Sequence, residues 1–240
     1  MKDVIIICIN GWSGGGSTGG MVTLKEKLQD ALVPLGVPSN NIFRRSWNHG
    51  GDEDARDDPN TSDLLTEIYH RTSNPSYLGI IGHSFGGWAA CRLSRDTNRE
   101  PDFVGLIDPV FGVDNVIRPP DRPRGKKIHN WYQHNSINNG DPCTGLGRIP
   151  CSKAYDGVAC GHSNVTNAIN KRERYEKWAD GSVKRVNCGF GKAKVLTSHH
   201  KMDDNPWIHQ NIININRENL LQMIALNQQL QIICGLINRQ

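Results

Sequence analysis

The stretch Tyr77-Leu-Gly-Ile-Ile-Gly-His-Ser-Phe-Gly-Gly87 decides how the rest of the chain is interpreted. It predicts a short apolar strand that ends at Ser84, and the helix-forming segment 88–94 follows directly. Gly-x-Ser-x-Gly at a strand-to-helix turn raises a serine hydroxyl on a sharp elbow, backed by a helix N-terminus. Gly82 and Gly86 suit such an elbow because a Cβ at either position would collide with nearby backbone. The simpler alternative is a glycine-rich turn that only packs tightly; the flanking strand and helix favour a nucleophile at Ser84.

Length and composition indicate a single domain. A chain of 240 residues suits one α/β domain over 1–240 with a sizeable core. Hydrophobic residues make up 37% and charged residues 22%, which is ordinary, although the apolar share is somewhat low. The net charge of +4 is mild, and the basic stretch 118–127 is broken by three prolines. We therefore predict no nucleic-acid partner.

The N-terminal segment 1–9 does not have the form of a signal peptide. Its apolar run is too short, and it continues into a glycine-rich loop without a small-residue cleavage site. No stretch reaches the ~20 apolar residues that cross a bilayer. We expect no transmembrane segment and, by default, a cytoplasmic location, unless a leader is missing from this chain.

The seven cysteines fall into two groups. Three lie in apolar patterns and are expected to be buried and reduced: Cys8, Cys91 and Cys234. Four lie in an irregular segment rich in Gly and Asn: Cys143, Cys151, Cys160 and Cys188. Two disulfides among these four would indicate an oxidising compartment and a secreted protein. Free thiols and a structural zinc site that includes His162 are the alternatives, although no Cys-x-x-Cys pair supports zinc.

Strand and helix patterns alternate along the chain. Strands are predicted at 3–9, 41–47, 77–83, 102–107, 126–132 and 193–197, and helical spacing of apolar residues appears at 24–32, at 64–68, after the elbow and from 206 onward. This alternation predicts an α/β fold with a mostly parallel, doubly wound sheet covered by helices. Segment 109–125 holds four prolines, so we expect an irregular connection there. The segment 133–192 is interpreted as an irregular cap or lid insertion, not as a second domain.

A serine nucleophile needs a histidine base and a carboxylate that orients the histidine. Both are sought directly after strands, because open α/β sheets place active sites at the carboxyl ends of their strands. Asp108 ends the strand 102–107 before a proline, with Asp141 as the reserve acid. His199 follows the segment 193–197 and is preferred over His200 as the base. The other histidines considered are weaker: His83 beside the nucleophile, His129 within a strand, His209 on the terminal helix and His162 in the insertion.

These residues carry a resemblance to a known family. The chain resembles the lipase and esterase branch of the α/β-hydrolase superfamily in its elbow Gly82-His-Ser-Phe-Gly86 and in the order Ser84, Asp108, His199. The segment Gly105-Leu-Ile-Asp-Pro109 is similar to the aspartate segment of pancreatic-type lipases. Ser198-His-His-Lys-Met-Asp-Asp204 is similar to a histidine segment of some bacterial members. The resemblance covers about 1–112 and 193–215; the insertion and the far tail match nothing in the family.

The resemblance also implies an oxyanion hole made from backbone N–H groups. One donor would be Phe85, directly after the nucleophile, and the other would be Trp12, in the loop after the first strand. The family often has His-Gly-x in that loop, where this chain has Asn10-Gly-Trp12. The glycine-rich continuation 14–20 has a rival interpretation as a phosphate cradle, but it lacks the Lys-Ser/Thr pair of a P-loop.

The sequence therefore predicts a serine hydrolase that cleaves carboxylic esters through an acyl-enzyme, with no cofactor and no metal. Its partner would be a small-molecule or lipid ester substrate. An amidase or thioesterase would use the same three residues. A hydrolase-fold binding module that no longer turns over is the alternative from another class. Oligomeric state is left open.

Overall fold

The structure is a computed structural model of the chain, and it describes residues 1–12, 19–52, 58–151, 160–189 and 191–237. Its centre is a six-stranded sheet in which every neighbouring pair of strands is parallel. The strands are β1 Val4–Asn10, β2 Ile42–Ser46, β3 Tyr77–His83, β4 Phe103–Ile107, β5 Ile128–Tyr132 and β6 Ile169–Arg172, in the order β2-β1-β3-β4-β5-β6. β1, β3 and β4 are buried along their whole length, as their continuous β-branched and apolar runs predict.

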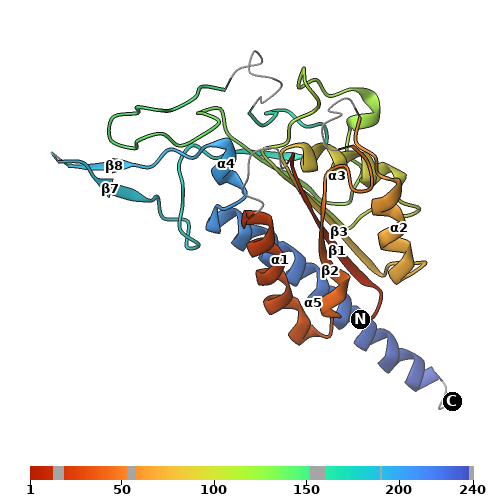
Figure 1. Cartoon of the computed structure of the whole chain (residues 1–240). Helices are drawn as coiled ribbons and strands as arrows, with labels where there is room; N and C mark the ends of the chain where they lie inside the picture. The colour runs from red at the N-terminus through yellow and green to blue at the C-terminus, as the bar shows by residue number, and fades with distance from the viewer. Residues whose placement is uncertain (13–18, 53–57, 152–159, 190, 238–240) are drawn as a thin grey trace.

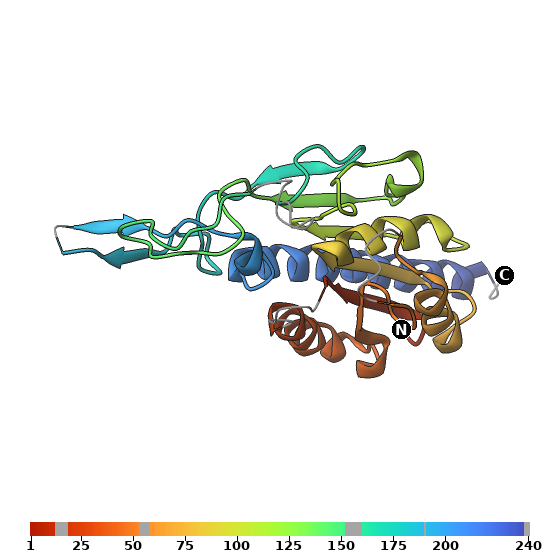
Figure 2. The same ribbon diagram turned by 45° about the horizontal axis from the view of Figure 1, so that its top comes forward.

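Helices cover both faces of this sheet (Figures 1 and 2). They are α1 Gly19–Leu32, α2 Ser62–Arg71, α3 Phe85–Asp96, the single turn α4 His199–Met202 and α5 Pro206–Ile237. α2 and α3 pack on the face that carries Ile5, Ile7 and Ile9. α1 and α5 pack on the opposite face, against Val4, Ile6 and Cys8. Because successive side chains of β1 point to opposite faces, one strand serves both cores. The predicted doubly wound α/β fold is confirmed.

The strand order fixes where a site can form. The chain leaves β1 through α1 to β2 on one side, then returns to β3 on the other side of β1. Doubly wound sheets open a crevice at the carboxyl ends of the strands where this change of direction occurs. Here that point lies between β1 and β3, so the loop after Asn10 and the elbow at Ser84 border the same crevice.

One strand prediction is wrong. The segment 193–197 does not join the parallel sheet; β8 Lys192–Lys194 pairs antiparallel with β7 Arg185–Asn187 in a separate ribbon. The sixth sheet strand is β6, which lies within the predicted insertion 133–192. β6 escaped notice because it is an edge strand with mostly exposed, polar residues and therefore has no apolar pattern. The cap role of the parts outside β6 stays a prediction.

Two disulfides staple the irregular region, Cys143–Cys188 and Cys151–Cys160. Their four sulfurs are therefore not thiolate ligands for zinc, and the described residues contain no cluster of His, Cys, Asp and Glu that would hold a metal ion. Cys8 and Cys91 are buried thiols, as predicted, but Cys234 is exposed. The prediction for Cys234 is wrong because the C-terminal half of α5 runs past the end of the sheet (Figure 1), and its side chains Leu226, Leu230 and Ile233 are exposed as well. Among the described helices none is long and apolar enough to cross a membrane.

Candidate active site

Ser84 occupies a strained elbow between β3 and α3. Its backbone has φ +58° and ψ −127°, which a non-glycine residue rarely adopts. The two flanking glycines are required by close backbone contacts. A Cβ on Gly82 would lie 1.9 Å from the carbonyl oxygen of Gly86, and one on Gly86 would lie 2.2 Å from the carbonyl oxygen of Ile9. The turn thus packs as tightly as the simpler interpretation required, and it also leaves Ser84 partly exposed to solvent.

His199 meets Ser84 from the far end of the chain. It begins α4 and is buried, and its Nε2 lies 2.8 Å from Ser84 Oγ. Its backbone N–H donates to the carbonyl of Ser136, which anchors the turn to the start of the insertion. His200, the alternative base, points to the exposed side of the same turn, and its ring centre is 6.0 Å from that of His199. The structure brings His199, and not His200, to the serine.

Asp108 completes the cluster from the end of β4. It is fully buried, with φ +46°, and its Oδ2 lies 2.7 Å from His199 Nδ1. Gln133, the residue after β5, holds the same carboxylate: its backbone N–H donates to Oδ1 at 2.8 Å and its Nε2 donates to Oδ2 at 2.9 Å. Gly161 covers the carboxylate closely, since a Cβ there would lie 2.0 Å from Oδ1. Asp108 is thus oriented from three directions.

These contacts set the tautomer of His199. A carboxylate only accepts hydrogen bonds, so Nδ1–H must donate to Asp108. Nε2 then carries the lone pair and accepts the hydrogen bond from the Ser84 hydroxyl. An imidazole in this state is able to take the hydroxyl proton, and the buried carboxylate beside it favours the imidazolium that results.

The reserve candidates lie elsewhere. Asp141 is exposed and accepts hydrogen bonds from Thr144 and from the N–H of Cys143, and these bonds, those from Thr144 first, lower its pKa. It closes a local turn and does not contact His199. His162 donates its backbone N–H to the carbonyl of Pro109, and its ring packs edge-on against Phe111. It lies near the acid but outside the Ser84–His199–Asp108 cluster.

The segments that carry the predicted oxyanion donors, the start of α3 and the loop after β1, both border Ser84. Phe85 is the first residue of α3, so its N–H belongs to the unpaired first turn of that helix. Gly11 contacts Ser84 so closely that a Cβ there would lie 3.1 Å from the hydroxyl oxygen. Trp12 follows Gly11 directly, which keeps its backbone in the same loop. Most of the glycine-rich segment 14–20, with its rival phosphate-cradle interpretation, lies outside the described residues.

A second imidazole–carboxylate pair lies behind His199, and the sequence did not reveal it. His83 Nε2–H donates to the carbonyl of His199 at 3.1 Å, and the two rings are 5.0 Å apart. On its other side, His83 Nδ1 is 3.8 Å from Oδ2 of the buried Asp203. Burial raises the pKa of Asp203 to about 7 and lowers the pKa of His83 well below its usual value. The pair therefore contacts the backbone of His199 through His83, on the side away from Asp108.

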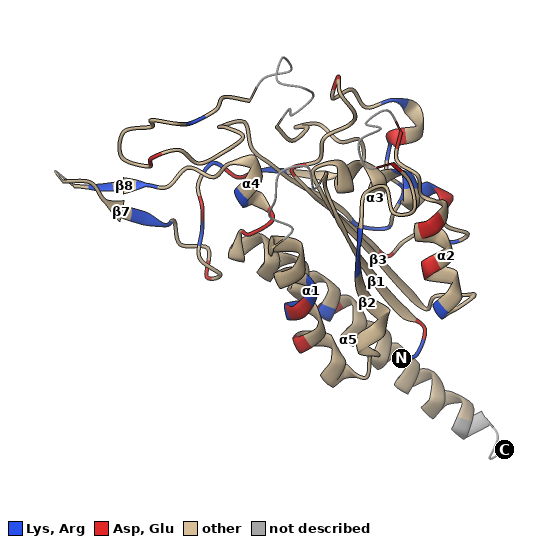
Figure 3. Cartoon of the chain, in the orientation of Figure 1, with Lys and Arg blue, Asp and Glu red and all other residues tan. Residues whose placement is uncertain are grey.

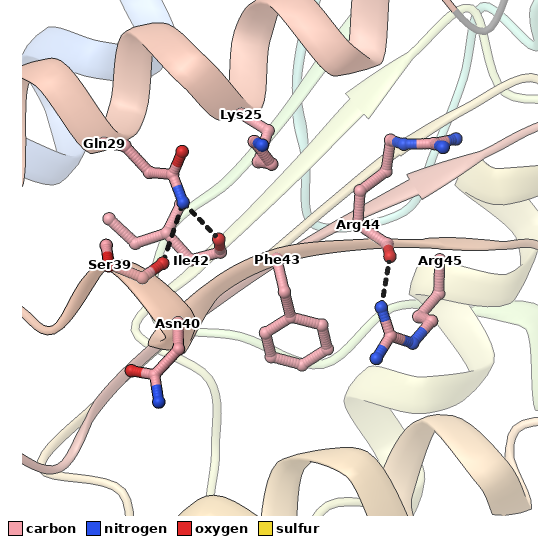
Figure 4. Close-up of a pocket in the computed structure, with 8 residues that line it drawn as sticks. All are labelled: Lys25, Gln29, Ser39, Asn40, Ile42, Phe43, Arg44 and Arg45. Carbon is pink, nitrogen blue, oxygen red and sulfur yellow. Dashed lines mark hydrogen bonds between the residues drawn. The ribbon is translucent and has the colours of Figure 1, made fainter.

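A surface hollow at the other edge of the sheet is unrelated to this cluster. Figure 4 shows its lining, which comes from α1, β2 and the turn before β2: Lys25, Gln29, Ser39, Asn40, Ile42, Phe43, Arg44 and Arg45. Several of its polar groups are already engaged, since Gln29 Nε2 donates to the carbonyls of Ser39 and Ile42. None of the lining residues belongs to the Ser84–His199–Asp108 cluster.

Comparison with known proteins gives few matches. No family model matches the chain, and no curated protein matches it. Among solved structures it is similar to a presumed hydrolase of the alpha/beta superfamily from Xanthomonas campestris pv. campestris, with 15% identity and a TM-score of 0.35 over 57% of this chain and 73% of that one. It is also similar to a presumed YdeN-like hydrolase from Pectobacterium atrosepticum, with 19% identity and a TM-score of 0.33 over 55% of this chain and 65% of that one.

The chain resembles the α/β hydrolases. The resemblance is carried by its own parallel sheet and by the serine elbow after β3.

Proposed function

We propose that this protein is a serine hydrolase that cleaves carboxylic esters. One observation carries the proposal: a continuous hydrogen-bonded chain runs from Ser84 Oγ through His199 to Asp108, with distances of 2.8 and 2.7 Å, at a strained strand-to-helix elbow. A positive φ at a non-glycine residue costs of the order of 1–3 kcal/mol and persists where it serves a site. Two such residues, Ser84 and Asp108, meet here.

The mechanism follows from the tautomer of His199. As Ser84 Oγ attacks the ester carbonyl carbon, its proton passes to Nε2, and the carbonyl oxygen becomes an oxyanion. The imidazolium then gives that proton to the leaving alkoxide, which departs as the alcohol and leaves an acyl-Ser84. Water attacks the acyl group with His199 as the base again, which releases the acid and restores Ser84.

Two backbone donors would stabilise the oxyanion. The N–H groups of Phe85 and Trp12 are the candidates, the first from the start of α3 and the second from the loop after β1. Loss of one donor typically lowers turnover by ~100 to 1,000-fold. Because both donors are main-chain groups, the replacement of the family's histidine by Asn10 leaves this function in place.

We further propose that the insertion 133–192 acts as a cap on the acid side of the site. Its first residue, Gln133, holds Asp108, and Ser136 accepts the backbone hydrogen bond of His199. Gly161 lies directly on the carboxylate. The two disulfides of the insertion favour an oxidising compartment and hence a secreted protein.

Labelling and hydrolysis test the proposal directly. The wild-type chain is expected to react with a fluorophosphonate probe and to hydrolyse short p-nitrophenyl esters, and Ser84→Ala is expected to lose both while its circular dichroism spectrum is unchanged. Ser39→Ala, at a surface turn remote from the elbow, is the matched control and is expected to behave as wild type. A wild-type chain that neither reacts nor hydrolyses would instead favour the binding module. Hydrolysis of matched amides or thioesters but not of esters would favour those leaving groups.

A further inference from the structure

The net positive charge of this protein is concentrated in one segment, which begins at the edge strand β6 and continues into the β7–β8 ribbon. Residues 171–194, here called the basic arm, contain eight Lys or Arg and three Asp or Glu, whereas the net charge of the whole chain is +4. The rest of the chain is therefore close to neutral. Figure 3 shows Lys and Arg on β7 and β8, in the ribbon that extends away from the parallel sheet.

Most of these charges have no counter-charge. Lys177 pairs with Glu173, and Lys184 pairs with Glu176. Five further basic side chains of the arm are exposed and form no ion pair with any described residue: Arg172, Arg174, Arg185, Lys192 and Lys194. Surface cations in a near-neutral protein usually lie among acidic neighbours, so five exposed and unpaired cations on one segment call for an anionic partner.

The register of the ribbon concentrates this charge further. Arg185 lies directly opposite Lys194, and Lys192 lies two residues along the same strand, so their side chains share one face. Like charges at directly opposite positions destabilise an antiparallel pair. Arg174 and Lys194 also lie 5.4 and 5.1 Å from the centre of the Tyr175 ring. An anion on this face would remove the repulsion.

The arm is held firmly to the proposed site. The Cys143–Cys188 disulfide joins the residue after β7 to the long loop that follows β5. Within the arm, the N–H of Lys184 donates to the carbonyl of Glu176. At the base of the arm, the N–H of Thr197 donates to the carbonyl of Arg174. Thr197 lies two residues before His199 in the chain. A partner bound along the arm would therefore be held by the segment that leads directly into His199.

Exposed apolar side chains accompany the cations. Trp178 is 56% exposed at the turn before β7, with the Lys184 ammonium 4.8 Å from its ring. Leu146 is 73% exposed in the loop that the Cys143 disulfide joins to the ribbon. A hydrated, soluble polyanion offers no apolar surface on which an exposed leucine could be buried. A lipid–water interface accommodates both features, because Trp and Leu enter the boundary of the acyl chains while Lys and Arg meet anionic headgroups.

We propose that the basic arm binds the surface of a lipid bilayer that contains anionic lipids. The partner is the charged surface of the bilayer. Binding to it would bring Ser84 close to lipids that contain ester bonds. The binding does not depend on ester hydrolysis, so it can be measured in a chain whose Ser84 has been replaced. Each basic residue near an anionic bilayer strengthens binding by about 5-fold, so removal of three should weaken it by about 100-fold.

Vesicle sedimentation tests the proposal. The Ser84→Ala chain is mixed with vesicles of phosphatidylcholine alone or of phosphatidylcholine with phosphatidylserine. Binding is expected only to the anionic vesicles, and it should weaken as salt is raised because ions screen the headgroups. The triple variant Arg185→Gln, Lys192→Gln, Lys194→Gln in the same background is expected to lose about 100-fold in affinity. Trp178→Ala is expected to weaken binding without changing its salt dependence.

A matched variant separates the arm from net charge. Lys2→Gln, Lys27→Gln, Arg95→Gln removes the same number of exposed cations from other parts of the chain and is expected to bind like the parent. Equal losses in the two triple variants would overturn the proposal, as would binding to dextran sulfate with none to anionic vesicles. Equal binding to both kinds of vesicle would do the same. Unchanged thermal unfolding of the arm variant shows that the fold is intact.

Discussion

The three residues of the candidate site that were predicted from the sequence share one property: Ser84, His199 and Asp108. Each lies where its local pattern is informative: a glycine-flanked serine after a buried strand, an aspartate that ends a strand before proline, and a histidine in a segment similar to a known one. The structure brings the three together, while their catalytic roles stay a prediction. Gln133 has no such pattern, and its contact with Asp108 depends on segments that meet only when the chain is folded. Asp203 lies in the histidine segment 198–204, but its approach to His83 likewise depends on the fold.

At the residue scale, Asp108→Asn tests whether Asp108 orients the His199 ring, because the substitution leaves the volume of the buried side chain nearly unchanged. The amide has nearly the same volume, but its NH2 group cannot accept the Nδ1–H hydrogen bond, so His199 should lose the correct tautomer. We expect turnover of a p-nitrophenyl ester to fall on the order of 10⁴-fold. Asp141→Asn is the control, because Asp141 is an exposed turn residue. Equal losses in the two variants, or none in Asp108→Asn, would count against the assignment.

Asp203 should make stability depend on pH in an unusual direction. Burial raises its pKa to about 7. Between pH 4 and 7 the folded state therefore binds more protons than the unfolded state, and this group's contribution to stability falls as the pH rises. Asp203→Asn removes this pH-dependent loss. As the pH is raised from 4.5 to 7.5, the free energy of unfolding of the variant should therefore rise relative to that of wild type, on the order of 2–4 kcal/mol.

Urea unfolding of both chains at the two pH values measures this difference. The comparison also cancels the opposite trend from His83 and His209, whose pKa values are lowered by burial. A stability difference between the two chains that does not change with pH would contradict the prediction.

At the scale of elements, buried strands were predictable and exposed ones were not. β1, β3 and β4 are covered on both faces, which requires continuous apolar runs. β6 and the ribbon strands β7 and β8 are largely exposed, so selection for burial leaves no periodic signal in them. Their positions depend on the rest of the fold: β6 pairs along the free edge of β5, and the Cys143–Cys188 disulfide holds the end of β7.

The elbow should be intolerant of a single methyl group. In Gly82→Ala the new Cβ would lie 1.9 Å from the Gly86 carbonyl oxygen, so β3 and α3 would have to move apart. We expect a loss of stability of at least ~1–3 kcal/mol. Gly19→Ala, at the start of α1, meets no atom within 4 Å and should be neutral or slightly stabilising. Thermal unfolding of the two variants checks this; equal midpoints would show that the elbow is less tightly packed.

The two disulfides should differ in their contribution. Cys143–Cys188 closes a loop with a sequence separation of 45, whereas Cys151–Cys160 spans 9. A longer loop loses more conformational entropy in the unfolded chain when it is closed. Replacing the first pair by serines should therefore cost about 3–4 kcal/mol, and replacing the second should cost less. Guanidinium unfolding under non-reducing conditions compares them, and the reverse order would contradict the entropic argument.

At the scale of the whole molecule, averages concealed the most distinctive surface. A net charge of +4 over 240 residues is mild, and it gave no reason to expect a charged partner. The basic arm carries this excess of positive charge, and its strands β7 and β8 project three of the cations away from the parallel sheet (Figure 3). Likewise, the apolar spacing after residue 206 correctly predicted a helix, but only the first half of α5 lies on the sheet, and Leu226 and Leu230 are exposed.

The amino-acid sequence alone determined five of the six strands of the parallel sheet and the serine elbow, because burial and tight turns impose local residue preferences that are readable along the chain. Tertiary structure alone decided that Gln133 holds the acid, that His83 and Asp203 support the histidine from behind, and that five unpaired cations share one arm. These are contacts between distant segments. Their energies depend on distance in space, on exclusion of water and on strand register, and none of these leaves a mark at a single position.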